Sequence, residues 1–344
     1  MQFASDNTAP VHPIVMSALQ KANDGYAASY GADVLMADVV KRIRRIFEAP
    51  EADVYLVSTG TAANALILGT LAAPFSTIFC SRNAHIQEDE CNAPEFYSGG
   101  AKLTLVNEAH AKISPEDLNA ALNNEGNRHP HGPSLGALSI SQATERGTIY
   151  SVQEIKALSA LAKEANMPTH MDGARFANAL VELNCSPADM SWRVGVDAVT
   201  FGGTKNGLMG VEAVIFFNPK HARDFELRRK RGGHLMSKHR FLSAQMLAYL
   251  TDDLWLNLAT SANGTARMLL NGLTQGNRAN IQSPVDVNML FVDWDIETHD
   301  RLTTAGAQFS ALPFDTEGRM SARLVTNWST SESSIQEFLE ILNK

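Results

Sequence analysis

The sequence has few cysteines and no long apolar segment. Only three of its 344 residues are cysteines, Cys80, Cys91 and Cys185, so we expect free thiols rather than a disulfide framework. No apolar run approaches the ~20 residues that cross a bilayer, and the N-terminus has neither the basic start nor the apolar core of a signal peptide. We therefore expect a cytoplasmic protein that binds no membrane.

Positive charge is also scarce. The chain has 29 Lys and Arg against 37 Asp and Glu, which gives a net charge of −8 and an isoelectric point near 5.7. Such an acidic chain lacks the electrostatic footprint of a nucleic-acid-binding protein, so we expect no nucleic-acid partner. A local phosphate site is still compatible with this charge, because the N-terminus of a helix supplies N–H donors regardless of the net charge.

Several common catalytic motifs are missing. The sequence contains neither the phosphate loop G-x-x-x-x-G-K-[ST] nor a G-x-G-x-x-G after the first predicted strand. It has no H-E-x-x-H or C-x-x-C, so we expect no metal site. It also lacks the G-x-S-x-G of serine hydrolases.

Short apolar runs alternate with helical patterns, which predicts an α/β fold with a mostly parallel sheet. Two helices have clear start signals, at Ser114-Pro115 and at the capping box of Ser151 and Glu154. The pattern changes after residue 248, so we predict a large domain at 1–248 and a smaller C-terminal α+β domain at 249–344. The predicted strands are 54–57, 77–80, 103–106, 137–140, 168–171, 198–201 and 213–217, with 288–294 and 321–328 in the smaller domain.

Three features of the large domain together indicate a cofactor. The small residues and hydroxyls of 58–64 follow a predicted strand and precede a helix, as in a phosphate cup. Asp172 ends another strand, and Lys205 follows the next strand 33 residues later. An acid to protonate a pyridine nitrogen and a lysine to form a Schiff base are what pyridoxal phosphate requires. Taken singly, each has an ordinary alternative: a strand–helix turn, a helix cap and a loop lysine.

The same residues resemble a known family, the low-specificity L-threonine aldolases. These are pyridoxal-phosphate enzymes of fold type I, the fold of aspartate aminotransferase. The resemblance covers most of the chain and includes the sequences HMDGAR and TKNG. The matching stretches are 3–7, 30–33, 58–64, 84–85, 170–175, 203–205 and 323–326.

The resemblance implies roles for individual residues. Lys205 would hold the cofactor as a Schiff base and Asp172 would pair with its pyridine nitrogen, while His85 would stack on its ring and serve as, or support, a base. The expected phosphate and ring contacts are Ser58, Gly60, Thr61 and Arg175. The expected substrate contacts are Ser5, Tyr30, Arg175 and Arg323. Because Tyr30 would approach from a neighbouring subunit, the resemblance implies a homo-oligomer, a dimer or tetramer, with shared active sites.

Two segments depart from the family pattern. Residues 141–147 read SQATERG, where many members carry a histidine that contacts the substrate hydroxyl. His131, or His129 in the same loop, could replace that histidine as a catalytic residue, although a solvated loop is an equal alternative. In the second segment, 229–234, either Lys230 or Arg231 could reach a phosphate across a subunit interface, or both could lie on a solvated face.

We therefore expect cleavage of L-threonine or L-allo-threonine, and of other β-hydroxy-α-amino acids, to glycine and an aldehyde. The base could be His85, His131 or an ordered water. The alternatives are another fold-type-I reaction on a small amino acid, such as β-elimination or cleavage of phenylserine-like substrates, and a non-enzymatic protein that retains the fold.

Overall fold

A computed structural model describes residues 1–276, 278–312 and 319–344. Its larger sheet has seven strands in the order β1-β9-β8-β7-β6-β2-β3. β9 runs antiparallel to both of its neighbours, whereas the other pairs are parallel. This confirms the predicted mostly parallel α/β sheet. The strands are β1 (Asp53–Val57), β2 (Ser76–Ser81), β3 (Lys102–Val106), β6 (Ser134–Ser141), β7 (Thr169–Gly173), β8 (Ala198–Phe201) and β9 (Glu212–Phe216).

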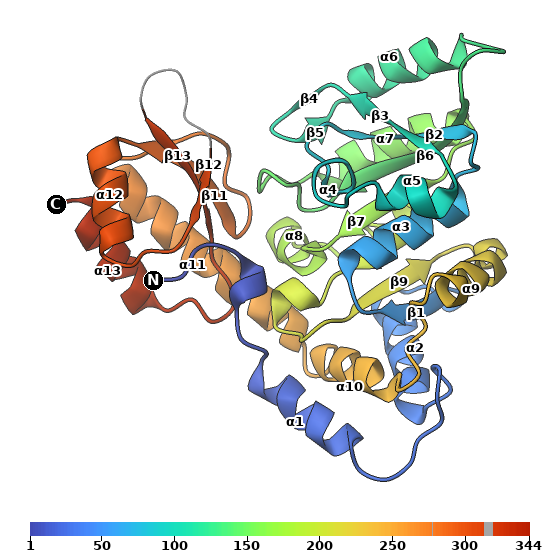
Figure 1. Ribbon diagram of the computed structural model, residues 1–344, viewed down its shortest axis with the longest axis horizontal. Coiled ribbons are helices and arrows are strands. Elements are labelled where there is room, and N and C mark those ends of the chain that lie inside the picture. The colour runs from blue at the N-terminus through green and yellow to red at the C-terminus, as the bar shows by residue number, and fades with distance from the viewer. Residues whose placement is uncertain (277, 313–318) are drawn as a thin grey trace.

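Helices cover both faces of this sheet (Figure 1). Successive residues of β9 show this arrangement: Ala213 and Ile215 pack into the main core, whereas Val214 and Phe216 pack into a second cluster beneath α3 and α9. A strand buried on both faces is expected to be largely apolar, and four of the five residues of β9 are apolar, the exception being Glu212 at its start. The helices of this part are α1 (Pro13–Ala22), α2 (Val34–Ile46), α3 (Gly60–Leu71), α4 (His85–Glu88), α5 (Ala93–Ser98), α6 (Pro115–Gly126), α7 (Val152–Glu164), α8 (Phe176–Leu183), α9 (Ala222–Arg231) and α10 (Arg240–Tyr249).

Local signals in the sequence place several of these helices. Ser114 caps α6 with Pro115 in the first turn, and Ser151 with Glu154 forms the predicted capping box of α7. The remaining short elements connect the larger ones. They are η1 (Asp6–Thr8), η2 (Trp192–Val194), η3 (Thr204–Asn206), η4 (Pro219–His221), β4 (Glu108–Ala109) and β5 (Lys112–Ile113).

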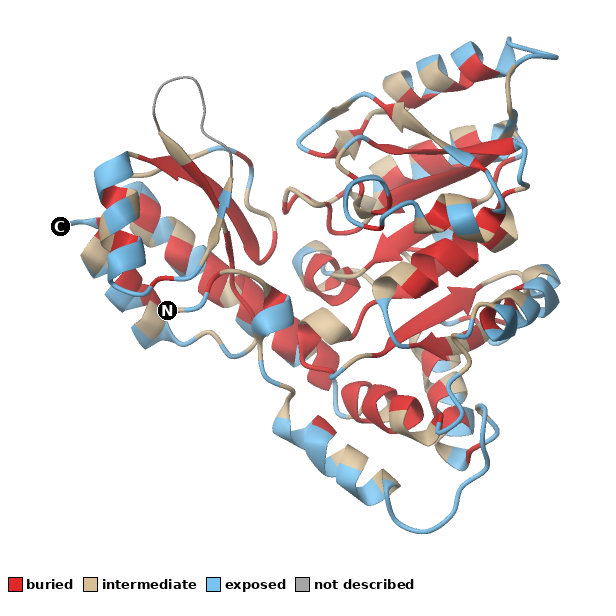
Figure 2. Ribbon diagram, viewed as in Figure 1, coloured by how far each residue is buried: buried red, intermediate tan, exposed pale blue. Residues whose placement is uncertain are grey.

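The C-terminal part forms a separate antiparallel sheet with its own core. Its strands lie in the order β10-β11-β13-β12, and Trp294, Leu324 and Phe338 belong to one buried core cluster. Figure 2 shows buried residues along both this sheet and the helices beside it. Long helix α11 runs from α10 toward this sheet (Figure 1). The elements are α11 (Leu254–Gly276), β10 (Asn280–Ile281), β11 (Met289–Trp294), α12 (Ile296–Thr304), β12 (Ser310–Leu312), β13 (Met320–Val325) and α13 (Glu332–Leu342).

The first residues of the chain pack with this C-terminal part. Phe3 is buried in its core, the N–H of Phe3 donates to the carbonyl of Gln308, and Val325 donates to the carbonyl of Phe3. The sequence placed these residues with the large domain, whereas their contacts lie with the small sheet. The predicted division after residue 248 stays a prediction. No helix in the described part of the chain is long and apolar enough to span a membrane.

Candidate active site

A pocket of about 270 Å³ lies where β1, β6, β7 and β8 end and α3 and α4 begin. Ligands of α/β proteins bind at this edge, because the loops that follow parallel strands meet there. Seven residues singled out from the sequence line the pocket: Ser58, Gly60, Thr61, His85, Asp172, Arg175 and Lys205. The fold therefore brings together groups that are spread over most of the large domain.

The N-terminus of α3 forms one wall of the pocket. Thr59 is the N-cap, and its hydroxyl accepts a hydrogen bond from the N–H of Ala62 at 3.1 Å. Gly60 and Thr61 occupy the first turn, where backbone N–H groups lack partners within the helix. These N–H groups, with the hydroxyls of Ser58 and Thr61, make a binding site for an anion such as a phosphate.

Asp172 lies at the end of β7 and is buried. Its Oδ2 accepts from the amide of Asn64 at 2.8 Å, and its Oδ1 accepts from the N–H of Ala174 at 2.9 Å. Burial alone would raise the pKa of Asp172, but the charges of His85, His170 and Lys205 outweigh this effect and hold the pKa below its usual value. Asp172 is therefore a carboxylate at neutral pH and can pair with a buried cation.

Lys205 lies in the short helix η3, on a tight turn. A Cβ added to Gly203 would come within 2.7 Å of the carbonyl oxygen of Val211, so this turn requires glycine. The N–H of Gly203 donates to the buried carboxyl group of Glu212 at 2.7 Å, which fixes the turn further. Burial lowers the pKa of the Lys205 amine, and the nearby Arg175 lowers it again. A neutral amine is the form that attacks carbonyl groups.

His85 begins α4 and is held by a residue that sequence reasoning missed. Its Nδ1 is 2.7 Å from Oε1 of Glu90, and the same oxygen accepts from the amide of Asn64 at 2.8 Å. The hydrogen bond to Glu90 raises the pKa of His85. Asn64 thus connects the His85–Glu90 pair to Asp172. The five-residue spacing of His85 and Glu90 is not a helical-face spacing, so the sequence offered no simple signal for this pair.

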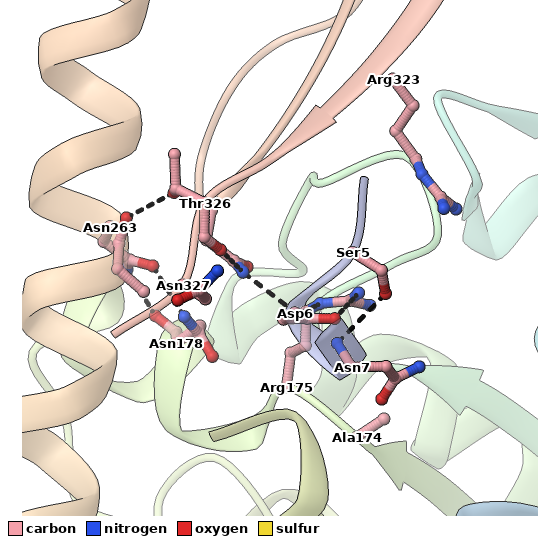
Figure 3. A network of polar contacts seen from close by, with 12 residues as sticks. Ser5, Asp6, Asn7, Ala174, Arg175, Asn178, Asn263, Arg323, Thr326 and Asn327 are labelled. Carbon is pink, nitrogen blue, oxygen red and sulfur yellow. Dashed lines mark hydrogen bonds and ion pairs between the residues drawn. The ribbon is translucent and has the colours of Figure 1, made fainter. Parts of the chain in front are cut away.

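Arg175 is held by an ion pair with Asp6, which the sequence did not predict (Figure 3). Its Nε and Nη2 donate to the two carboxylate oxygens of Asp6 at 2.7 and 2.9 Å, and the amide of Asn288 donates to Asp6 at 3.2 Å. Burial would raise the pKa of Asp6, but the charges of Arg175 and Lys205 hold it below the usual value. Asp6 therefore joins the N-terminal segment to the pocket and to the C-terminal part.

Arg323 projects from β13 on the same side of this network as Ser5 (Figure 3). Its Nη2 donates to the hydroxyl of Ser310 at 3.1 Å and to the carbonyl of Ala4 at 3.4 Å, while its buried Nε has no partner among the described residues. Burial lowers the pKa of Arg323, and the charge of Arg175 lowers it further. Neither Arg323 nor Ser5 lines the pocket within this chain.

The remaining predicted residues lie elsewhere. The amine of Lys230 lies over the ring of Tyr30, 4.7 Å from the ring centre, and both residues line a separate hollow. His129 and His131 lie in the loop that precedes β6, whereas the pocket lies after Ser141 at the other end of that strand, about 25 Å away at ~3.3 Å per residue. The structure therefore does not bring His131 to the pocket, because strand direction places its loop at the opposite edge of the sheet.

The chain is similar to known enzymes over nearly its whole length. The profile of the β-eliminating lyase family matches residues 2–297. A low specificity L-threonine aldolase from Pseudomonas sp. (strain NCIMB 10558) is 38% identical over 337 residues, which cover 98% of this chain and 95% of that protein. A structure of threonine aldolase from Leishmania major is 28% identical with a TM-score of 0.94, and the match covers 99% of this chain and 98% of that one.

A more distant structure shares the fold. Serine palmitoyltransferase from S. paucimobilis, solved with bound PLP-myriocin, is 18% identical with a TM-score of 0.70, and the match covers 100% of this chain and 86% of that one. This likeness confirms the predicted fold type. The profile match and the near-complete coverage of the Pseudomonas relative decide the family. The chain belongs to the β-eliminating lyase family, among the low-specificity L-threonine aldolases.

Proposed function

We propose that this protein cleaves L-threonine and L-allo-threonine, with other β-hydroxy-α-amino acids, to glycine and an aldehyde, using pyridoxal phosphate. The observation that carries the proposal is the convergence in one pocket of Lys205, Asp172, His85 and the N-terminus of α3. The relatives named as threonine aldolases support the same reaction.

The residues of the pocket fit pyridoxal phosphate. The first turn of α3 offers free N–H donors to the phosphate. Asp172 offers a buried carboxylate to the pyridine nitrogen, and Lys205 offers an amine of lowered pKa to the aldehyde carbon. Thr204 also lines the pocket, next to Lys205, and places a hydroxyl beside the bound cofactor. When bound, this cofactor accepts the electron pair released at Cα of the substrate.

The protein residues orient the substrate around that centre. Arg175 would bind the substrate carboxylate, with Arg323 reaching it from β13, because a guanidinium binds a carboxylate through two parallel hydrogen bonds. Asp6 keeps Arg175 in place through its two hydrogen bonds. The imidazole of His85 lines the pocket with its Nδ1 held by Glu90, and no described residue forms a hydrogen bond with its Nε2. His131 has no role in this proposal.

Product analysis tests the reaction. The purified protein, supplied with pyridoxal phosphate and L-threonine, should release glycine and acetaldehyde in equal amounts. Lys205→Ala should lose both this activity and the visible absorption band of the bound cofactor, whereas Lys220→Ala at an exposed position should keep both. Release of a 2-oxo acid and ammonia instead would favour β-elimination. A visible band that persists in Lys205→Ala would place the cofactor on another lysine.

We also propose that the active protein is a homo-oligomer in which Tyr30 reaches a partner's pocket. Tyr30 is 51% exposed and lies outside the pocket of its own chain. If the sites are shared, mixing Lys205→Ala with Tyr30→Ala chains should restore activity in the hybrids, because one site then keeps both wild-type residues. Mixtures that stay inactive despite subunit exchange would contradict the proposal.

A further inference from the structure

Glu145 lines the pocket but has no role yet in the proposed reaction. It follows β6, in the segment 141–147 that departs from the family pattern, and it lies beside His85. One carboxyl oxygen, Oε1, accepts from the hydroxyl of Ser141 at 2.6 Å and from the backbone N–H of His85 at 2.8 Å. These two bonds, one from β6 and one from α4, fix the direction of the carboxyl group.

The other oxygen of Glu145 has no partner. Oε2 is buried, and no described residue forms a hydrogen bond with it. Leaving a buried polar atom unpaired is unfavourable, and native proteins rarely keep such atoms without a reason. Because this oxygen belongs to a side chain that lines the pocket, a bound ligand can supply the missing partner.

The other proton-accepting groups that line the pocket already have partners or roles. The carboxyl group of Glu212 accepts from the N–H of Gly203 at 2.7 Å and from the side chain of Thr204. Both oxygens of Asp172 accept hydrogen bonds from Asn64 and Ala174. Lys205 is assigned to the cofactor. The Nδ1 of His85 is held by Glu90, and this hydrogen bond raises the pKa of the ring, which suits His85 to donate a proton.

The surroundings of Glu145 favour a group that both accepts and releases a proton near neutral pH. Burial raises its pKa to about 7, and the charge of Asp172 on β7 adds to this, while the hydrogen bonds from Ser141 and from the backbone of His85 oppose it. Two other titratable groups interact with it, Cys80 on β2 and Tyr150. Burial raises the pKa of both, so they are neutral at this pH.

We propose that Glu145 is the catalytic residue that accepts the β-hydroxyl proton of the substrate. This inference rests on the proposed aldolase function. The β O–H bond breaks, its proton goes to Oε2, and its electron pair forms the C=O bond of the aldehyde. The Cα–Cβ bond breaks, and its electron pair stays at Cα. A proton from His85 or solvent then completes glycine at Cα, and Glu145 returns its own proton to water, so protons and electrons balance.

Two rates separate removal of the β-hydroxyl proton from proton transfer at Cα. Cleavage of L-threonine requires removal of the β-hydroxyl proton, whereas exchange of the glycine α-proton with heavy water does not. In the holoenzyme, Glu145→Gln should lower kcat for L-threonine cleavage by about 10²-fold or more, the usual contribution of a general base. It should reduce glycine exchange, followed by NMR, far less. Glu125→Gln, which alters a buried glutamate of α6 outside the pocket, is the matched control and should change neither rate.

Two further measurements test the proposal without relying on the loss of turnover in Glu145→Gln. Burial raises the pKa of both Glu145 and Glu212 to about 7, so infrared difference spectra of the wild-type protein should show carboxylic-acid absorption from both groups that disappears as the pH rises through that value. Glu145→Gln should lose the part of this absorption that belongs to Glu145, whereas Glu125→Gln should keep all of it. Ser141→Ala removes a hydrogen bond that favours the carboxylate, so it should move the acidic limb of the kcat profile to higher pH. This second variant also tests the proposal if Glu145→Gln does not fold.

Each contrary outcome has a distinct meaning. Equal loss of cleavage and exchange in Glu145→Gln would assign Glu145 a structural role, and no loss of cleavage would assign the proton to His85 or water. Either result, or an unshifted pH profile in Ser141→Ala, would overturn the inference while leaving the aldolase function intact. A wild-type protein that releases no glycine from L-threonine would refute the proposed function itself.

Discussion

Mutation of the buried ion pair between Asp6 and Arg175 should lower the free energy of unfolding strongly. The side chains of Asp6 and Arg175 are only 1% and 11% exposed, and two hydrogen bonds of 2.7 and 2.9 Å join them. Replacing Asp6 with alanine leaves the guanidinium buried without its counter-charge and leaves the amide of Asn288 with one acceptor fewer. Breaking such a pair costs about 3–5 kcal/mol.

This cost can be measured in thermal or urea unfolding of the protein without added cofactor. For a chain of 344 residues, about 3–5 kcal/mol corresponds to a fall of about 4–7 °C in the unfolding midpoint. Since Arg175 would no longer be fixed, Asp6→Ala should also weaken the binding of glycine to the holoenzyme, seen as a smaller spectral change at a given glycine concentration.

The ion pair between Glu182 and Arg267 provides the matched control. It joins α8 to α11 at 2.6 Å, with side chains that are 33% and 53% exposed, whereas the Asp6–Arg175 pair joins η1 to the start of α8. Water screens an exposed pair, so Glu182→Ala should cost about 0–1 kcal/mol and leave glycine binding unchanged. If Asp6→Ala proved as mild as Glu182→Ala in both measurements, the positioning of Arg175 by Asp6 would be refuted.

Two other residues give predictions of their own. Asp172→Asn removes a buried carboxylate from the cofactor site, and a loss of about 3–5 kcal/mol in the transition state should lower kcat by about 10²–10⁴-fold; near-normal turnover would contradict the assignment. Burial lowers the pKa of His170 from the usual 6.5 to about 4, so the unfolded chain binds a proton that the folded chain does not. The free energy of unfolding should therefore fall by about 3 kcal/mol as the pH drops from 6.5 toward 4. His170→Asn should show a shallower pH dependence in urea unfolding, and an unchanged slope would assign the effect to other groups.

Much of the fold could be predicted because its signals are local. The strand predicted at 198–201 has the bounds of β8, and the caps at Ser114 and Ser151 mark the starts of α6 and α7. Periodicity and capping depend on residues within a few positions of one another, so they can be seen in the sequence. The packing of Phe3 against the C-terminal core could not be predicted this way, because it joins the two ends of the chain.

Local sequence patterns could not predict the hydrogen-bond partners of the site residues either. Asn64 and Asp172 are 108 residues apart, and Asp6 and Arg175 are 169 residues apart, yet each pair forms hydrogen bonds shorter than 3 Å. His131 is a residue that the sequence suggested for the site but that the fold places elsewhere. Its chemistry suited a base, but the direction of β6 places its loop away from the pocket.

The sequence by itself therefore determined the α/β class, the order of the elements and the chemical groups that converge on the pocket. Lys205 and Asp172 lie at or just after the ends of predicted strands, and the carboxyl ends of parallel strands meet at one edge of the sheet. Only the tertiary structure decided which groups pair there: Glu90 with His85, Asp6 with Arg175, and the free oxygen of Glu145 with none of the described residues. The physical reason is that hydrogen bonds and pKa values depend on distances of a few ångströms, which the packing of distant segments sets.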